Sequence, residues 1–130
     1  MAASTSGPMR TGSGVRSAFS GGVLRAWLET PAVGDREAHQ FAKEINEAIQ
    51  SWGRRVKSLV IDVSEVRSMT SLGLGVIVNA RNAAAEHGAS TYVLGATREL
   101  ADLFRMMRID RLCTLVLDEP ELKKVLAGRR

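Results

Sequence analysis

Hydrophobic and polar positions repeat with two different periods along the chain, and these periods predict its elements. From Asp35 to Gly53, apolar residues recur every three or four positions, which is typical of a helix with one buried face. Asp35 is the expected N-cap and Gly53 the expected stop. Residues 58–63 form a short run, Ser-Leu-Val-Ile-Asp-Val, that is β-branched and almost wholly apolar. Such a run is typical of a strand covered on both faces.

The same signals place the other elements and define the fold class. We expect a hairpin of residues 15–19 and 23–28, strands at 91–94 and 113–117, and further helices at about 71–87, after Thr97 and after Asp118. Strands that alternate with helices of this length indicate a layered α/β fold. The sequence therefore predicts one α/β domain, with a mixed, mainly parallel β-sheet of about four to five strands covered by about four α-helices.

Composition separates the first residues from the rest. The first 22 residues hold ten Ser or Gly and too little apolar surface to offset the entropy of ordering. We therefore expect a flexible leader over residues 1–14, a domain over 15–127 and a C-terminal tail over 128–130. The leader lacks the apolar core of a secretory signal. An organellar transit peptide is the alternative, because the segment contains Arg and no acid before Glu29.

The net positive charge suggests a nucleic-acid partner, but the positions of the charged residues along the chain do not support one. The 130 residues carry 18 Lys and Arg against 14 Asp and Glu, a formal charge of +4. Residues 1–34 supply half of this excess, and residues 35–130 are nearly balanced. The acids Asp102 and Asp110 lie beside and within the Arg-containing segment 105–111, and no aromatic residues interleave there for base stacking. We expect no nucleic-acid partner. No apolar run is long enough to insert directly into a membrane.

The sequence gives little support for a catalytic site, a cofactor site or a metal site. Gly73-Leu74-Gly75 lacks the third glycine of a dinucleotide fingerprint, because position 78 is valine. His39 and His87 lie far apart without a second ligand at helical spacing. Cys113, the one cysteine, excludes an intrachain disulfide and fits an inert core position in a reducing compartment. We therefore expect no enzyme activity, no cofactor and no metal.

The most informative segment runs from Asp62 to Gly75. A buried strand ends at Asp62, a loop follows, and Thr70-Ser71 precede a helix. Hydroxyls at a helix N-terminus lie where free N–H groups and the helix dipole favour negative charge. A phosphate there would be stabilised locally and would add about −1.5 to −2 charges to an exposed surface. An ordinary N-cap with no further role is the alternative interpretation.

This segment resembles the STAS domain, the fold of bacterial anti-anti-sigma factors. The resemblance rests on residues 59–64 (Leu-Val-Ile-Asp-Val-Ser), on residues 69–77 (Met-Thr-Ser-Leu-Gly-Leu-Gly-Val-Ile), and on closing elements around 88–90 and 103–112. It implies a non-enzymatic, cytoplasmic anti-sigma factor antagonist. Its implied partner is an anti-sigma factor that is also a serine kinase of the histidine-kinase-like ATPase fold, and a serine phosphatase would reset it.

By position, Ser71 is the implied phosphorylation site. The implied switch loop and partner surface comprise Asp62, Ser64, Met69, Thr70, Leu72, Gly73 and Gly75. Two positions depart from the family pattern, because Thr70 replaces an acid and Leu72 replaces a serine. Thr70 is therefore the alternative acceptor. The alternative function is a non-phosphorylated structural STAS subunit of a stress-signalling assembly or of a membrane-transport complex for lipids or anions.

Overall fold

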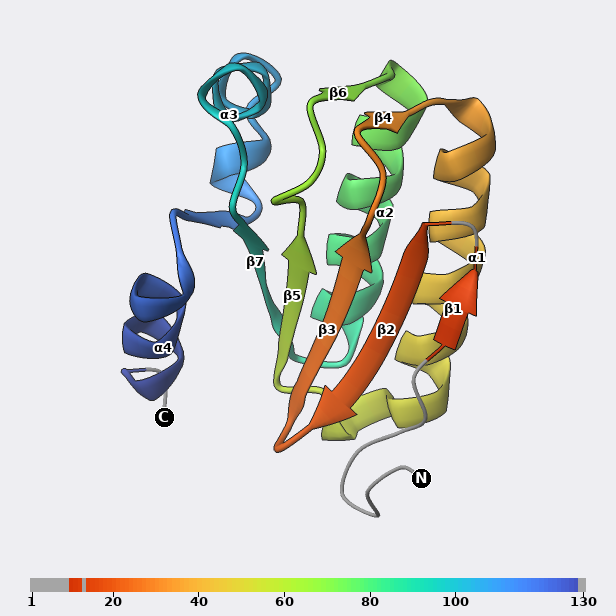
Figure 1. The fold of residues 1–130 in the computed structure, drawn as a ribbon. Coiled ribbons are helices and arrows are strands. Elements are labelled where there is room, and N and C mark those ends of the chain that lie inside the picture. The colour runs from red at the N-terminus through yellow and green to blue at the C-terminus, as the bar shows by residue number, and fades with distance from the viewer. Residues whose placement is uncertain (1–9, 13, 129–130) are drawn as a thin grey trace.

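The computed structural model describes residues 10–12 and 14–128, which form a sheet with helices on both faces (Figure 1). The strands are β1 (Arg10–Gly12), β2 (Val15–Ser20), β3 (Val23–Leu28), β4 (Ala32–Val33), β5 (Ser58–Asp62), β6 (Ser68–Met69), β7 (Ser90–Leu94) and β8 (Thr114–Val116). The helices are α1 (Asp35–Trp52), α2 (Ser71–Glu86), α3 (Arg98–Met106) and α4 (Glu119–Ala127), with 3-10 turns η1 (Gly53–Arg55) and η2 (Ile109–Arg111).

The main sheet has the order β1-β2-β3-β5-β7-β8. The first three strands are antiparallel neighbours, and β3, β5, β7 and β8 run parallel to one another. Gly21 and Gly22 both have positive φ and form the β2–β3 turn, a conformation that glycine adopts without strain. The predicted single α/β domain with a mixed, mainly parallel sheet and four helices is confirmed.

Alternation along the strands distributes side chains between two cores. One face packs under α1 and α2, where Phe41, Ile45 and Ile77 are fully buried against strand residues. The opposite face of β5, β7 and β8 packs under α4, with Leu122 as its buried residue. The central strand β5 is buried at all five positions because helices cover both of its faces. Figure 1 shows α1 and α2 side by side, with α4 on the far side of β7.

Most predicted helix ends are confirmed, and one is wrong. Thr97 and Asp118 accept hydrogen bonds as the N-caps of α3 and α4, and Gly53 is the C-cap of α1. The N-cap of α1 is Gly34 rather than Asp35. The carbonyl of Gly34 accepts the first helical bond from Ala38, and the Glu37 carboxylate accepts from the Gly34 N–H, so Asp35 is already helical.

The beginning of the chain differs from the expected leader. Residues 10–12 form β1 and pair with β2 in register, which adds a sixth strand to the expected sheet. Backbone hydrogen bonds to an existing strand edge can order a segment that has little apolar surface of its own. Residues 1–9 and 13 of the expected leader, and 129–130 of the expected tail, lie outside the described residues.

Candidate functional site

The end of β5 is a buried polar junction centred on Asp62, which is 6% exposed. One carboxylate oxygen of Asp62 accepts hydrogen bonds from the backbone N–H (3.0 Å) and the hydroxyl of Ser64. The other oxygen accepts from the Arg25 guanidinium of β3 at 2.7 Å. Asp62 and Ser64 are thus brought together as a turn that fixes where the loop to α2 leaves the sheet.

Arg25 extends this junction to α4. Its guanidinium also donates to both carboxylate oxygens of Glu119, the first residue of that helix. The hydrogen bonds from Arg25 lower the pKa of Glu119. The pKa of Arg25 is raised, because its hydrogen bonds to Glu119 and Asp62 outweigh the lowering effect of burial. Three elements far apart in the sequence therefore meet through one guanidinium, which suits the bidentate geometry of carboxylates.

A two-stranded parallel ladder holds the rest of the loop. Strand β4 pairs with β6, so that Val33 lies beside Met69. The carbonyl of Pro31 accepts from the N–H groups of Arg67 (2.7 Å) and Ser68 (3.0 Å), and that of Val33 accepts from Thr70 (3.0 Å). The backbone immediately before α2 is therefore fixed by hydrogen bonds to the segment before α1. We did not expect this ladder, because two-residue strands are too short to show an alternating pattern.

Thr70 and Ser71 have different roles at the start of α2. Thr70 is the N-cap, with extended backbone, and its hydroxyl oxygen accepts from the Gly73 N–H at 3.3 Å. Ser71 is the first helical residue and is exposed, and its hydroxyl makes no hydrogen bond to any described residue. The two hydroxyls are adjacent, but the one of Thr70 is engaged in capping the helix.

The two glycines that follow also differ. A Cβ on Gly73 would lie 2.6 Å from Cγ of Met69 and 3.1 Å from Cγ1 of Val33, so a larger residue would collide with the β4–β6 ladder. A Cβ on Gly75 would meet nothing within 4 Å, and this residue is exposed. Close packing of the helix start therefore depends on Gly73 and not on Gly75.

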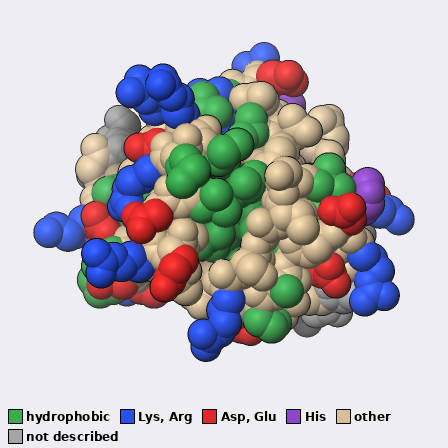
Figure 2. All heavy atoms as spheres, turned by 90° about the horizontal axis from the view of Figure 1, so that it is seen from above, with side chains coloured by type: hydrophobic (Ala, Val, Ile, Leu, Met, Phe, Trp, Pro, Cys, Tyr) green, Lys and Arg blue, Asp and Glu red, His purple; other side chains and the backbone are tan. Residues whose placement is uncertain are grey.

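Apolar surface lies at the same end of the molecule. Figure 2 views the molecule from above, toward the end that carries β4, β6 and the start of α2, and shows hydrophobic side chains gathered in the middle with charged groups around them. Leu72, in the first turn of α2, is 39% exposed. Met106 and Met107, at the end of α3, are also exposed. A patch with an apolar centre and a charged rim is typical of protein–protein contact surfaces.

Other candidate chemistry can be located as well. Cys113 is buried, and burial raises the pKa of its thiol to about 11, which disfavours the reactive thiolate. Within residues 10–12 and 14–128, no group of three or more His, Cys, Asp or Glu side chains could hold a metal ion. No helix in this part of the chain is long and apolar enough to cross a membrane.

The sequence model of the family described as "Mlab, STAS domain" matches residues 32–117. The chain belongs to the STAS domain family. This match includes Asp62 and Ser64, the β4–β6 ladder and the start of α2, so the resemblance inferred from residues 59–64 and 69–77 is confirmed. Among curated protein sequences, none matches this chain significantly.

Solved structures share the fold of this STAS domain at low sequence identity. An anti-sigma-factor antagonist (STAS) domain protein from Planctomyces limnophilus superposes with a TM-score of 0.74 at 15% identity, covering 83% of this chain and 92% of that one. The phosphorylated form of the Bacillus cell fate determinant SpoIIAA gives 0.62 at 13% identity, covering 94% and 98%. The murine anion transporter Slc26a9 gives 0.63 at 12% identity, covering 75% of this chain and 16% of the transporter.

Proposed function

We propose that this STAS domain is a non-enzymatic protein-binding module of the bacterial cytoplasm that antagonises an anti-sigma factor, and that a phosphate on Ser71 switches its binding. The observation that carries the proposal is the placement of Ser71, whose exposed hydroxyl begins α2 beside exposed Leu72. Similar folds in anti-sigma factor antagonists, one of them solved in a phosphorylated form, support it.

A phosphate on Ser71 is compatible with the fold. The first backbone N–H groups of α2 have no partner within the helix, and the helix dipole places partial positive charge there. Of these groups, the Gly73 N–H donates to the hydroxyl of Thr70. A phosphate on Ser71, the residue after Thr70, would interact with the same end of the helix. The modification would therefore change the surface without unfolding the domain.

The same charge would oppose a partner that covers this end of the molecule. Leu72 follows Ser71 directly, and the apolar centre in Figure 2 lies at this end. A contact that buries apolar surface there would also bury about −1.5 to −2 charges, which is costly unless they are paired. Gly75, one turn further and without a side chain, leaves room for close approach of the partner backbone.

Ser71 is the preferred acceptor over Thr70. The Thr70 hydroxyl caps α2, so a kinase acting on it would have to break that hydrogen bond. The Ser71 hydroxyl has no such bond to a described residue. In this proposal the loop from Asp62 to Met69 keeps Ser71 in place through the Ser64 turn and the β4–β6 ladder. The proposed partner is an anti-sigma factor that is itself a serine kinase of the histidine-kinase-like ATPase fold, with a serine phosphatase as the resetting enzyme.

Binding to an anti-sigma factor kinase of the histidine-kinase-like ATPase fold, taken from the same organism, tests the proposal. Ser71→Asp should weaken binding at least about tenfold in calorimetry, because a desolvated unpaired charge costs more than about 1.4 kcal/mol. Ser20→Asp is the matched control, since exposed Ser20 lies in the β2–β3 hairpin at the other end of the sheet. Equal binding by both variants, with melting temperatures like that of the wild type, would refute the switch.

A structural STAS subunit of a stress-signalling assembly or transport complex is the second candidate. The similar domain within the Slc26a9 anion transporter favours it, as does Thr70, which stands where the family pattern has an acid. In that case binding would not respond to charge at Ser71, and the partner would copurify whether or not ATP is present. Comparing the binding of the Ser71→Asp and Ser20→Asp variants therefore also distinguishes the phosphorylation switch from the structural subunit.

A further inference from the structure

Strand β8 is the last strand on one side of the main sheet, so one of its edges has no neighbour among the described strands. Figure 1 shows α3 above and α4 below this side of the sheet. A hollow of about 340 Å³ lies here and is lined by Ala96, Ala101, Arg105, Leu115, Val116, Leu117 and Glu121. The strand, Thr-Leu-Val, contains neither a charged residue nor proline, which often protect sheet edges from pairing.

The direction of the backbone groups shows which residue of this edge can pair. The Val116 carbonyl accepts from the Gly95 N–H, directly after β7, at 3.0 Å. Successive residues of a strand direct their N–H and C=O groups to opposite sides. The N–H and C=O groups of Leu115 therefore point away from β7, to the open edge.

The next N–H groups along this edge already have acceptors. The Cys113 N–H donates to the Ile109 carbonyl at 2.9 Å. The Leu117 N–H donates to the Glu121 carboxylate at 2.7 Å. A long peptide strand would therefore gain few hydrogen bonds here. Two copies of the chain that pair antiparallel about Leu115 would exchange both hydrogen bonds of that residue.

We propose that the β8 edge binds a second copy of this chain, as an antiparallel two-fold pair centred on Leu115. In this register, position 117 of each copy lies opposite position 113 of the other. Leu117 is 74% exposed and Leu112 is 38% exposed. The pair brings Leu117 of each copy beside Leu112 of the other, and the symmetry forms this contact twice. Both contacts remove apolar surface from water.

The charges of α4 fit the same symmetry. Leu122 packs this helix against residues of β5, β7 and β8, so α4 lies over β7. In the paired sheet the two β7 strands are three strand spacings apart, about 14 Å, which long side chains from both helices can span. Glu121 and Lys124 share one face of α4, and Glu121 lines the hollow at the edge. Because the two helices run antiparallel, each Glu121 faces Lys124 of the other copy.

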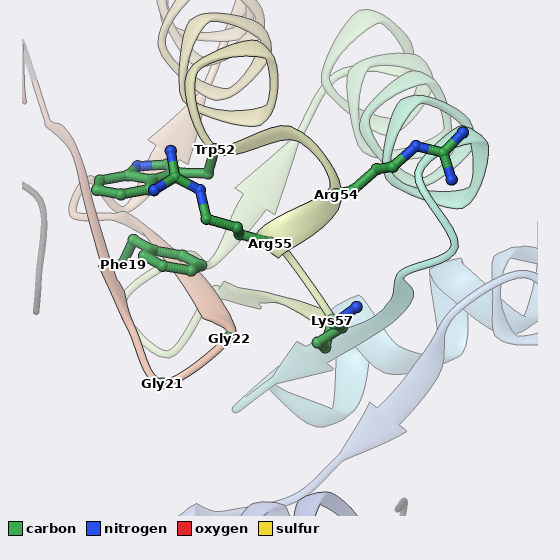
Figure 3. A pocket seen from close by; sticks show the side chains of 7 residues that line it. All are labelled: Phe19, Gly21, Gly22, Trp52, Arg54, Arg55 and Lys57. Atoms are coloured by element: carbon green, nitrogen blue, oxygen red, sulfur yellow. The ribbon is translucent and has the colours of Figure 1, made fainter.

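The surface at the end of α1 offers no comparable fit to a second copy. The charged residues that line its hollow are Arg54, Arg55 and Lys57, and no acid lines it. Figure 3 shows Arg55 directed toward the Trp52 ring and Arg54 directed away from it. Two copies that met there would bring like charges together, which opposes association.

The proposed pairing leaves Ser71 accessible in both copies. Strands β5, β7 and β8 run parallel, and β5 ends on the side of the sheet where α2 begins. An antiparallel pair directs these ends in opposite directions, so the dimer would present two Ser71 surfaces far apart. The inference does not rest on phosphorylation, and failure of either proposal leaves the other intact.

Sedimentation equilibrium of the full chain measures the association. Between about 5 and 500 µM, we expect the average mass to rise from that of one chain toward twice that value. The expected Kd is on the order of 100 µM, as suits a small interface. The mass of one chain at every concentration would overturn the proposal. A mass beyond two copies would also overturn it, because the pair uses the β8 edge of both copies.

Two leucine variants locate the contact. Leu117→Glu places a charge in the proposed interface and should weaken association at least about tenfold, because burying an unpaired charge is costly. Leu72→Glu makes the same change at the start of α2 and should weaken association less than about twofold. Equal or greater weakening by Leu72→Glu would overturn the edge as the interface. Melting temperatures like that of the wild type confirm that both variants fold.

Charge exchange on α4 tests the antiparallel arrangement. Glu121→Lys places like charges opposite each other and should weaken association about three- to tenfold at low salt. Adding Lys124→Glu restores opposite charges across the two-fold axis and should recover most of this loss. A double variant that associates as weakly as Glu121→Lys, with the melting temperature of the wild type, would overturn the arrangement.

Discussion

Substituting alanine for Gly73 and for Gly75 should have opposite effects on stability. Both residues lie in the first turns of α2, two positions apart. A Cβ at position 73 would lie 2.6 Å from Cγ of Met69, whereas one at position 75 would meet nothing within 4 Å. At position 73 the first turn of α2 closely approaches Met69 and Val33 of the β4–β6 ladder, and Ser71 lies in that same turn. The pair therefore tests how the proposed switch residue is positioned.

The expected magnitudes follow from two opposing effects. Alanine is more favourable than glycine inside a helix by about 0.5–1 kcal/mol. Gly75→Ala should gain this amount in full. Gly73→Ala gains the same amount but incurs an overpacking cost of about 1–3 kcal/mol, because Met69 and Val33 must shift. The helix preference cancels in the difference between the two variants, which leaves the packing cost alone.

Urea denaturation of the two variants and the wild type measures these free energies. In a domain of this size, 1 kcal/mol corresponds to about 3–6 °C in melting temperature, so both signs are measurable. Adding Met69→Ala should remove much of the penalty at position 73, and a double-mutant cycle would quantify the coupling. Gly73→Ala as stable as Gly75→Ala would refute the close packing of α2 on the ladder.

Three further outcomes are expected. Thr70→Ala should destabilise the fold by about 1 kcal/mol, because it removes the cap of α2, whereas Ser71→Ala should change it by less than about 0.5 kcal/mol in urea denaturation. Pairing with Arg25 lowers the pKa of Glu119 below its ordinary value of 4.5. Because Glu119 is exposed, the pair contributes less than about 1 kcal/mol to the free energy of unfolding above pH 4.5. This contribution is lost as the pH falls through the lowered pKa. The stability of Glu119→Gln should therefore fall less than that of the wild type on acidification, and parallel curves would contradict the pairing. Cys113, with a thiol pKa of about 11, should react with a disulfide reagent only as fast as the domain unfolds, so rapid reaction of the native protein would contradict its burial.

Local patterns were sufficient to predict the helices and the main strands. Thr97 and Asp118 precede amphipathic runs, and each caps a helix in the structure, because capping depends on residues within one turn. The β5 strand was evident from its continuous apolar run. Gly34 was missed as a cap because its role depends on backbone conformation and on Glu37, whereas Asp35 has the usual side chain of a cap.

Contacts between distant segments could not be predicted in the same way. Arg25 meets Asp62 and Glu119 across 37 and 94 positions, and nothing local to any of the three marks the junction. The β4–β6 ladder has two residues in each strand, which is below the length of a visible pattern. One continuous segment of sequence contains most of the candidate site residues, so they also lie close together in the structure. Seven of them lie in the junction, in the ladder or in the first turn of α2: Asp62, Ser64, Met69, Thr70, Ser71, Leu72 and Gly73. Their roles in a switch remain a prediction.

Phosphorylation by an anti-sigma factor kinase of the histidine-kinase-like ATPase fold, taken from the same organism, tests the central claim most directly. The chain is incubated with that kinase and ATP, its phosphate is located by mass spectrometry, and the modified protein is then assayed for binding to the kinase. We predict one phosphate on Ser71, no phosphate on the Ser71→Ala variant, and binding of only the unmodified chain. Phosphate on neither Ser71 nor Thr70, or equal binding before and after modification, would contradict the account.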